Sequence, residues 1–278
     1  MPEEKQNIKY YVDNNLPMPE GMTMEKIEVD LFSFDAGHLK LCNYDHPLPE
    51  GFIMNDGILY LGGYKHPLPE GFSMSGGNLN LYNYDHPLPE GLTQVGGSLS
   101  LEGYPHPLPE GLQQVSGGLD LHGYPHPLPE GLTQVAGTLT LRDYPHPLPE
   151  DLKLGWLLDL TGYDHPLPEG LTEISGSLVL NYYPHPLPEG LTQIGGSLDL
   201  GNYDYPLPEG FQIGAALDLK GYTHPLPEGL QIAGDLILRD YPHPLPEDIQ
   251  VEGKIHFLDD YQHELPKSLQ NKVEQIKL

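Results

Sequence analysis

The sequence has a single cysteine, Cys42, and only 13 basic residues against 40 acidic ones, which gives a formal net charge of −27. One cysteine excludes a disulfide framework and a zinc knuckle built from cysteine pairs. A charge of this sign repels nucleic-acid backbones and anionic lipid surfaces, because both bind basic patches. We therefore expect no direct nucleic-acid partner, no membrane partner and no cofactor.

The sequence also lacks an apolar run of about 18 residues, the length that a membrane-spanning helix needs. Its first residues, Met1-Pro2-Glu3-Glu4-Lys5, are too polar for a cleaved signal peptide. These observations predict a cytoplasmic protein without a signal peptide or transmembrane segment. Secretion by a signal-independent route stays open.

Glycine and proline are abundant, at 33 and 31 residues, and they recur in a fixed pattern. The tetrapeptide Pro-Leu-Pro-Glu is copied every 19 or 20 residues, and a Leu-x-Leu segment stands between successive copies. A repeat of this length is typical of a solenoid, in which each unit buries its apolar side chains against its neighbours. The copies begin at Pro47, Pro67, Pro87, Pro107, Pro127, Pro147, Pro166, Pro186, Pro206, Pro225 and Pro244.

Each part of the unit predicts its own conformation. Leu-x-Leu alternates with period two, which predicts a short strand whose two leucines face the same side. Pro-Leu-Pro lacks two backbone donors and has fixed φ angles, which favours extended chain. We predict an all-β solenoid of about 12 coils, with short parallel strands, an extended proline-rich opposite side and no long helices.

The two ends depart from the repeat, as solenoid caps do. Residues 1–37 contain a degenerate copy, Pro17-Met18-Pro19-Glu20, and a candidate strand at Ile27–Leu31, so we predict an N-terminal cap there. Residues 38–263 form the repeat solenoid.

Residues 264–278 lose the Pro-Leu-Pro sequence and place Leu269, Val273 and Ile276 at helical spacing. This spacing predicts a short amphipathic helix that covers the last coil as a C-terminal cap.

The units resemble leucine-rich repeats. Leu-Asp-Leu-His-Gly-Tyr at 119–124 is similar to the Leu-x-Leu-x-x-Asn core of that family, and Leu108–Leu112 resembles the short 20-residue repeats of bacterial effectors. Tyr44–Leu48 and Tyr84–Leu88 resemble the Phe-Asn-x-Pro-Ile motif of FNIP repeats, known from amoebae and giant viruses. The resemblance covers about residues 38–266 and implies a protein-binding sheet face and a microbial or viral host-directed role. One departure is that tyrosine occupies the family's asparagine-ladder position.

Two columns of aromatic residues accompany the repeat. Twelve units begin with tyrosine, and histidine follows two residues later in every unit except the one with Tyr205. We interpret both columns as structural ladders, in which tyrosine rings stack and histidine nitrogens satisfy backbone carbonyls of the adjacent coil. Metal binding, pH sensing and ligand sequestration by the same columns are the alternatives. The ladder residues of three central units are Tyr104, His106, Tyr124, His126, Tyr144 and His146.

The sequence predicts no enzyme. Glycine pairs stand at fixed turn positions rather than in a phosphate-binding loop, and no nucleophile–base set stands apart from the repeat. The adjacent carboxylates Glu150-Asp151 and Glu247-Asp248 arise because aspartate replaces the glycine of Glu-Gly.

The residue between the two leucines, and the residue after them, vary from unit to unit on a constant scaffold. This pattern predicts a recognition surface for another protein, formed by the outer face of the sheet. The chain would act as a monomer, or as a homodimer paired end to end or face to face. The candidate partner-binding residues are Tyr60, Tyr82, Glu102, Asp120, His122, Arg142, Asp159, Val179, Asp199, Asp218 and Ile237.

The glutamate of each Pro-Leu-Pro-Glu copy forms a third column. Its structural interpretation is that each carboxylate accepts backbone N–H groups of the following Gly-Leu. Its functional interpretation is an acidic stripe for a partner with a basic surface. The alternative function is therefore an acidic mimic, which binds a nucleic-acid-binding protein electrostatically and competes with the nucleic acid.

Overall fold

The computed structural model describes residues 8–20, 38–257 and 261–275. The chain divides into two compact units, Met1–Gly137 and Thr138–Leu278. It is an all-β parallel solenoid of about 11 turns, with repeats about 20 residues apart and one short helix in the part described. The fold class predicted from the repeat is confirmed.

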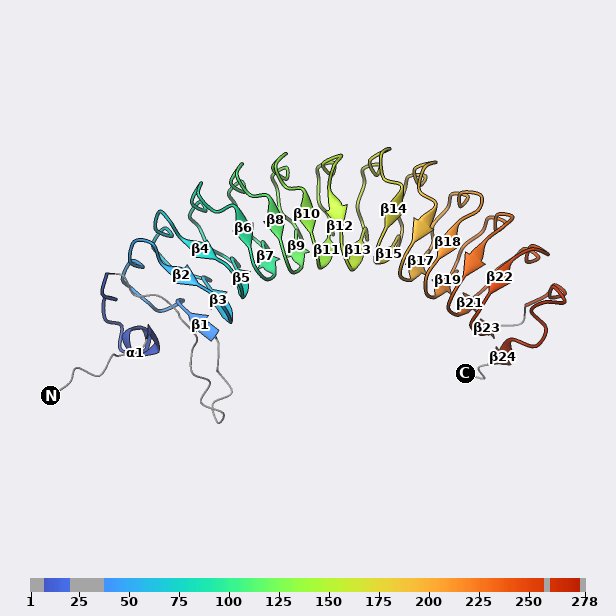
Figure 1. Cartoon of the computed structure of the whole chain (residues 1–278), viewed down its shortest axis with the longest axis horizontal. Coiled ribbons are helices and arrows are strands. Elements are labelled where there is room, and N and C mark those ends of the chain that lie inside the picture. Colours follow the sequence, from blue (N-terminus) through green and yellow to red (C-terminus); the bar gives the residue numbers. More distant parts are fainter. Residues whose placement is uncertain (1–7, 21–37, 258–260, 276–278) are drawn as a thin grey trace. The chain divides into compact units, whose positions relative to one another are not determined.

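The Leu-x-Leu segment of each coil forms a strand of a parallel sheet, which we call the leucine sheet of its unit. Leu99 pairs with Leu119 in unit 1, and Leu198 pairs with Leu217 in unit 2. Within each unit the strands lie side by side in sequence order (Figure 1). They are β1 (His38–Lys40), β3 (Ile58–Tyr60), β5 (Asn78–Asn80), β7 (Leu99–Ser100) and β9 (Leu119–Asp120) in unit 1, and β11 (Thr138–Thr140), β13 (Leu157–Asp159), β15 (Ser177–Val179), β17 (Leu198–Asp199), β19 (Leu217–Asp218), β21 (Leu236–Leu238), β23 (Ile255–Phe257) and β24 (Val273–Gln275) in unit 2.

A second parallel sheet in each unit was not predicted from the sequence. We call it the glutamine sheet, because most of its strands pair an outward glutamine with a buried valine or isoleucine. The strands are β2 (Ile53–Met54), β4 (Ser73–Met74), β6 (Gln94–Val95), β8 (Gln114–Val115) and β10 (Gln134–Val135) in unit 1, and β14 (Glu173–Ile174), β16 (Gln193–Ile194), β18 (Gln212–Ile213), β20 (Gln231–Ile232) and β22 (Gln250–Val251) in unit 2. Strand β12 (Lys153–Leu154) of unit 2 precedes β14 and is not paired with it.

The core of each coil lies between its two short strands and its Pro-Leu-Pro segment. In the coil of β9, Leu108, Leu112, Val115 and Leu119 are all buried. The same apolar positions recur in each coil, so burial is shared along the stack, and no coil has to close a core by itself.

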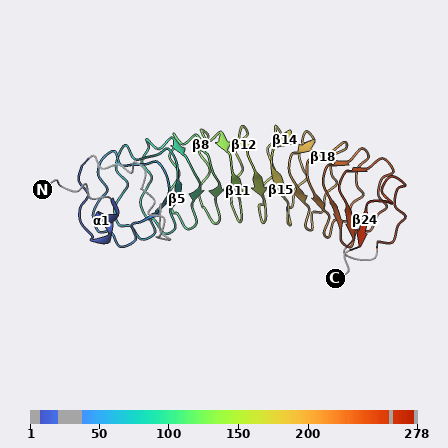
Figure 2. The same cartoon turned by 60° about the horizontal axis from the view of Figure 1, so that its bottom comes forward.

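Helix α1 (Ile8–Asp13) was not predicted from the sequence, and it lies at the N-terminal end of unit 1 (Figure 2). Its end has a Schellman motif: Asn15 has a φ of 48°, the Asn15 N–H donates to the Val12 carbonyl, and the Leu16 N–H donates to the Tyr11 carbonyl. Within the described ranges, no helix has the length and apolar character needed to cross a bilayer.

The degenerate copy at Pro17–Glu20 keeps a contact of the full repeat. The Tyr44 hydroxyl donates to the Leu16 carbonyl at 2.9 Å and accepts the Met18 N–H at 3.2 Å. This copy therefore precedes the first full coil as a partial one. The strand predicted at Ile27–Leu31 lies outside the described residues.

The helix predicted for residues 264–278 is wrong where the structure describes this segment. Leu269 is buried, and its N–H donates to the Pro266 carbonyl in the turn that the other coils use. The chain then forms β24, in which Val273 pairs in parallel with Ile255 of β23. The free edge of β23 offers backbone partners, and this tertiary pairing prevails over the helical spacing of the apolar residues.

Lys272 closes the end of the glutamine sheet in unit 2. Its ammonium donates hydrogen bonds to the carbonyls of Val251 in β22 and of Glu252, the latter at 3.1 Å. Unpaired edge carbonyls invite pairing with other chains, and lysine is a residue that natural edges use against this.

We expect Lys272→Met to lower the free energy of unfolding by about 1–2 kcal/mol, because methionine keeps the aliphatic length but leaves two carbonyls without their charged donor. Urea denaturation measures this change. Lys267→Met is the matched control, since Lys267 is exposed and its side chain makes no hydrogen bond in the part described. Equal stability of the two variants would contradict the capping role.

Candidate functional site

Eleven of the twelve column tyrosines are buried and Tyr261 is half-buried, and they bridge each coil to the one before it. The Tyr104 hydroxyl donates to the His86 carbonyl at 3.2 Å and accepts the Leu88 N–H at 3.0 Å. Leucine has the only backbone donor in Pro-Leu-Pro, so the phenol satisfies the one N–H that this segment has. The phenol thus serves the backbone, as the side-chain amide does in an asparagine ladder.

Tyrosine rings also stack on one another. Tyr104 lies 6.4 Å from Tyr84 and 6.5 Å from Tyr124 between ring centroids, with interplanar angles of 7° and 10°. Burial raises the pKa of Tyr104, Tyr183 and Tyr222 to about 12. A buried, stacked and hydrogen-bonded column offers no aromatic platform to a ligand.

The column histidines bind the backbone of the preceding coil. His126 Nε2 lies 2.7 Å from the Pro105 carbonyl, and because a carbonyl only accepts, Nε2 carries the proton. Tyr205, which replaces histidine in its unit, donates its hydroxyl to the Pro184 carbonyl at the same 2.7 Å. Two different side chains at this position of the repeat thus donate to the equivalent backbone carbonyl of the preceding coil, which indicates a structural role.

Three histidines of this column face a carboxylate instead. Their Nε2 atoms have no hydrogen-bond partner among the described residues, and they lie 3.3–3.6 Å from aspartate oxygens. The described residues contain no group of three or more His, Cys, Asp or Glu side chains that could hold a metal ion. The pairs are His106 with Asp85, His185 with Asp164 and His224 with Asp204.

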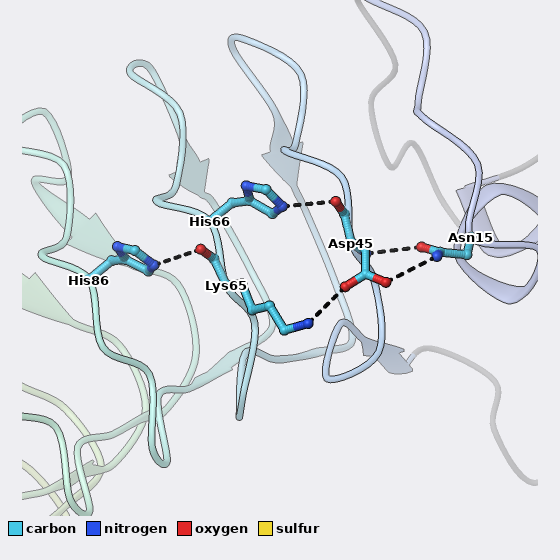
Figure 3. A network of polar contacts seen from close by, with 5 residues as sticks. All are labelled: Asn15, Asp45, Lys65, His66 and His86. Atoms are coloured by element: carbon cyan, nitrogen blue, oxygen red, sulfur yellow. Dashed lines mark hydrogen bonds and ion pairs between the residues drawn. The ribbon is translucent and has the colours of Figure 1, made fainter.

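At the start of the repeat the same positions form a polar network (Figure 3). Asp45 exchanges hydrogen bonds with the Asn15 amide and accepts the Lys65 ammonium at 3.0 Å. The His66 and His86 rings reach the Asp45 and Lys65 carbonyls, each at 2.9 Å. Lys65 and then Asn15 lower the pKa of Asp45. The network joins the partial first coil to the next ones, and its polar groups form hydrogen bonds with one another.

The predicted partner-binding residues of unit 1 lie along its leucine sheet. Tyr60 and Asp120 are half-buried on the outer face of β3 and β9, and Tyr82 is 48% exposed after β5. The Tyr60 ring lies 6.2 Å from the His38 ring and 5.8 Å from the Lys40 ammonium. Glu102 and His122 are exposed at the corresponding turns.

The predicted residues of unit 2 form a continuous row. The pairing of β13, β15, β17, β19 and β21 places them opposite one another in register, and all are half-buried. Arg142 lies beside the row, with Nη2 3.4 Å from an Asp159 carboxylate oxygen. In sequence order the row is Asp159, Val179, Asp199, Asp218 and Ile237.

The aspartates of this face have a local role that was not predicted from the sequence. The Asp120 carboxylate accepts the N–H of His122 at 3.1 Å, two residues later, and Asp159, Asp199 and Asp218 repeat the contact at 3.0 Å. Such Asx turns end the strand and turn the chain into the corner. Burial raises the pKa of Asp218, and the neighbouring Asp199 adds to this effect. The side chains of the face that accept no such N–H include Tyr60, Tyr82, Val179 and Ile237, although the Tyr82 N–H itself donates to the Asn80 side chain at 3.0 Å.

Tyr182, in the turn that follows β15 of unit 2, was not predicted as a partner-binding residue either. It is 69% exposed, and its φ is 60°, in the left-handed region. Glycine or asparagine holds this position in most other coils, for example Gly123, Gly162 and Asn202. A non-glycine residue there costs roughly 1–2 kcal/mol. The doublet Tyr182-Tyr183, in place of Gly-Tyr, is the sequence signal that could have revealed it.

Tyr182→Asn is expected to raise the free energy of unfolding by about 0.5–1 kcal/mol, since asparagine tolerates the left-handed conformation. Thermal and urea denaturation would measure the gain. Tyr82→Asn is the matched control, because Tyr82 is also an exposed aromatic residue but is not among the residues with positive φ. A gain of the same size in the control would show that backbone strain is not its source.

Comparison of the chain with protein-family models, with curated proteins and with solved structures finds no match. What the structure shows is a parallel β-solenoid with a repeat of about 20 residues.

Proposed function

We propose that this protein is a non-catalytic scaffold that binds another protein through the outer face of its leucine sheets. The observation that carries the proposal is Tyr182, which keeps a strained backbone and an exposed ring although its hydroxyl has no hydrogen bond in the part described. Residues in strained backbone conformations cluster at functional sites. Exposed aromatic residues are also the side chains that dominate binding energy at protein interfaces.

Each unit contributes its own anchors to the proposed surface. In unit 1 they are Tyr60 and Tyr82, with His38 and Lys40 beside the Tyr60 ring. In unit 2 they are Val179, Tyr182 and Ile237. The aspartates between these anchors accept backbone N–H groups in Asx turns, so we expect the apolar and aromatic side chains to supply the contact area with the partner. The partner is expected to present apolar or aromatic groups, surrounded by basic residues that match the acidic scaffold.

Affinity capture from native lysate tests this surface. Tyr60→Ser/Tyr82→Ser and Val179→Ser/Tyr182→Asn change one unit each, and each double variant is expected to reduce capture of the partner at least tenfold. Trp156→Ser is the matched control, because Trp156 is 81% exposed and lies before β13, outside the face. Capture that is equal in wild type and both double variants would refute the proposal.

The glutamate column favours a second candidate, the acidic mimic of a nucleic acid. Every glutamate of the eleven Pro-Leu-Pro-Glu copies is exposed. The turn N–H that these carboxylates could have accepted is taken by a proline carbonyl, as in Leu112 to Pro109 at 3.0 Å. Binding that disappears at about 0.5 M NaCl would favour the mimic, because salt screens exposed charges. Binding that persists favours the sheet face.

We also propose that the chain is related to leucine-rich repeats. The Leu-x-Leu strands and the Pro-Leu-Pro-Glu turns support a solenoid of leucine-rich-repeat type, with units similar to FNIP repeats, and this resemblance supports a host-directed microbial or viral role. We also propose a cytoplasmic location, because the sequence has a single cysteine, Cys42, and disulfide-poor proteins are typical of reducing compartments.

A further inference from the structure

A groove lies on the glutamine sheet of unit 2, on other strands than the proposed protein-binding face. Its volume is about 170 Å³. Residues that line it include Gln193, Gln212, Gln231 and Gln250, together with Gly214 and Ala233, each two residues after a glutamine.

The groove follows from a one-residue change in the repeat. Pro186 stands seven residues before Gln193, whereas Pro206 stands six residues before Gln212, and the next two coils keep the shorter spacing. The missing residue is the one that precedes glutamine, Thr192 in the longer coil. The chain therefore loses a side chain beside each of three successive glutamines, and the residues after the strands are as small as Gly214 and Ala233.

The groove presents a regular row of unoccupied amides. Gln193 pairs with Gln212, Gln212 with Gln231 and Gln231 with Gln250, so the row repeats with the strand spacing of about 4.8 Å. The four side-chain amides make no hydrogen bonds within the described structure, and all four residues are exposed. Each amide offers both a donor and an acceptor, the pair that neighbouring sugar hydroxyls match.

The negative charge of the chain limits which ligands this groove can bind. The row itself is neutral, but Glu252 lines the groove and the chain carries −27, so an anionic polymer would be repelled. A second copy of the chain would bring the same charge. Four glutamines also bury far less than the roughly 800 Å² per partner of a stable protein interface.

We propose that this groove binds one edge of an extended, neutral polysaccharide, where its hydroxyls project, with one sugar residue for each coil. A β-1,4-linked hexose chain fits this description, because it is a straight ribbon whose advance per sugar is close to the spacing between the strands. Each glutamine donates a hydrogen bond to one hydroxyl and accepts one from its neighbour. This site is independent of the proposed protein-binding function, because it uses a different sheet.

Calorimetric titration of the full chain with cello-oligosaccharides of two to six sugars tests the proposal. Affinity is expected to rise with length up to four sugars, one per glutamine, and then to level off. Maltohexaose is the control ligand, since it has the same sugars in α-1,4 linkage and does not run straight. Absence of cellohexaose binding, or equal binding of maltohexaose, would overturn the proposal.

Two double variants locate the site. Gln212→Ala/Gln231→Ala is expected to weaken cellohexaose binding about tenfold, because each variant side chain loses its hydrogen bonds to the sugar. Gln94→Ala/Gln134→Ala removes the equivalent glutamines of unit 1, where Thr93 and Thr133 still precede them, and should leave binding unchanged. Unchanged circular dichroism shows that both variants fold. Equal binding by both variants would overturn the proposal, and so would dimerisation through Gln212 and Gln231 without saccharide binding.

Discussion

Raising the pH from about 9 to about 11.5 is expected to unfold the protein, with loss of its β-sheet circular dichroism. The cause is the tyrosine column. Burial raises the pKa of Tyr104, Tyr183 and Tyr222 to about 12. The same cause raises the pKa well above the ordinary value of about 10 for Tyr64, Tyr84, Tyr163, Tyr203 and Tyr241.

A raised tyrosine pKa means that the folded chain keeps phenolic protons at a pH where the unfolded chain has released them. The stability that this adds is fully present below about pH 10 and is lost as the pH rises toward about 12. At about pH 11, each such tyrosine lowers the free energy of unfolding by about 1.4 kcal/mol. Eight tyrosines then remove on the order of 10 kcal/mol, comparable to the whole stability of a typical domain.

Tyrosinate absorbance and circular dichroism, followed together, test this expectation. The two signals should change in one transition, at a higher pH than the tyrosinate transition of the protein in denaturant. Tyrosinate absorbance that rises as in denaturant, while the circular dichroism stays native, would contradict the buried ladder.

Tyr183→Phe is expected to lower the free energy of unfolding by about 2–4 kcal/mol. The Tyr183 hydroxyl donates to the His165 carbonyl at 3.1 Å and accepts the buried Leu167 N–H at 2.9 Å. Phenylalanine keeps the ring that stacks between Tyr163 and Tyr203, so the variant removes the bridge and little else. Both backbone groups lose their partner in a place with little access to water.

The matched control for this variant is Tyr205→His, which restores the residue that the repeat has at this position. Either side chain can donate to the Pro184 carbonyl, so the change is expected to stay within about 0.5 kcal/mol. Urea denaturation compares the two variants. If Tyr183→Phe were as stable as Tyr205→His, the phenol bridge would contribute nothing to the fold.

The leucine sheets could be predicted from the sequence because Leu-x-Leu has an unbroken period of two and recurs every 19 or 20 residues. The glutamine sheets could not, since each strand has only two residues and begins either six or seven residues after the first proline of Pro-Leu-Pro-Glu, without a regular pattern. At the C-terminus, Leu269 and Val273 have helical spacing, but the edge of β23 was not visible in the sequence. Pairing with that edge, rather than local periodicity, decides the conformation of β24.

The location of the candidate face followed from the variable positions of the repeat, and the structure places them together within each unit. The contacts of single side chains did not follow. Asp120 and Asp199 look like free acidic groups in the sequence, but each accepts an N–H two residues later. Tyr182 looks like a chance variation until its backbone conformation is known.

Hydrogen–deuterium exchange of the full chain, with and without its captured partner, tests the proposed binding face most directly. We expect new protection at residues 80–83 and 179–182, the turns that present Tyr82 and Tyr182, with little change at the Pro-Leu-Pro-Glu turns. Protection confined to the glutamate turns, for example residues 88–91, with residues 80–83 and 179–182 unchanged, would contradict it.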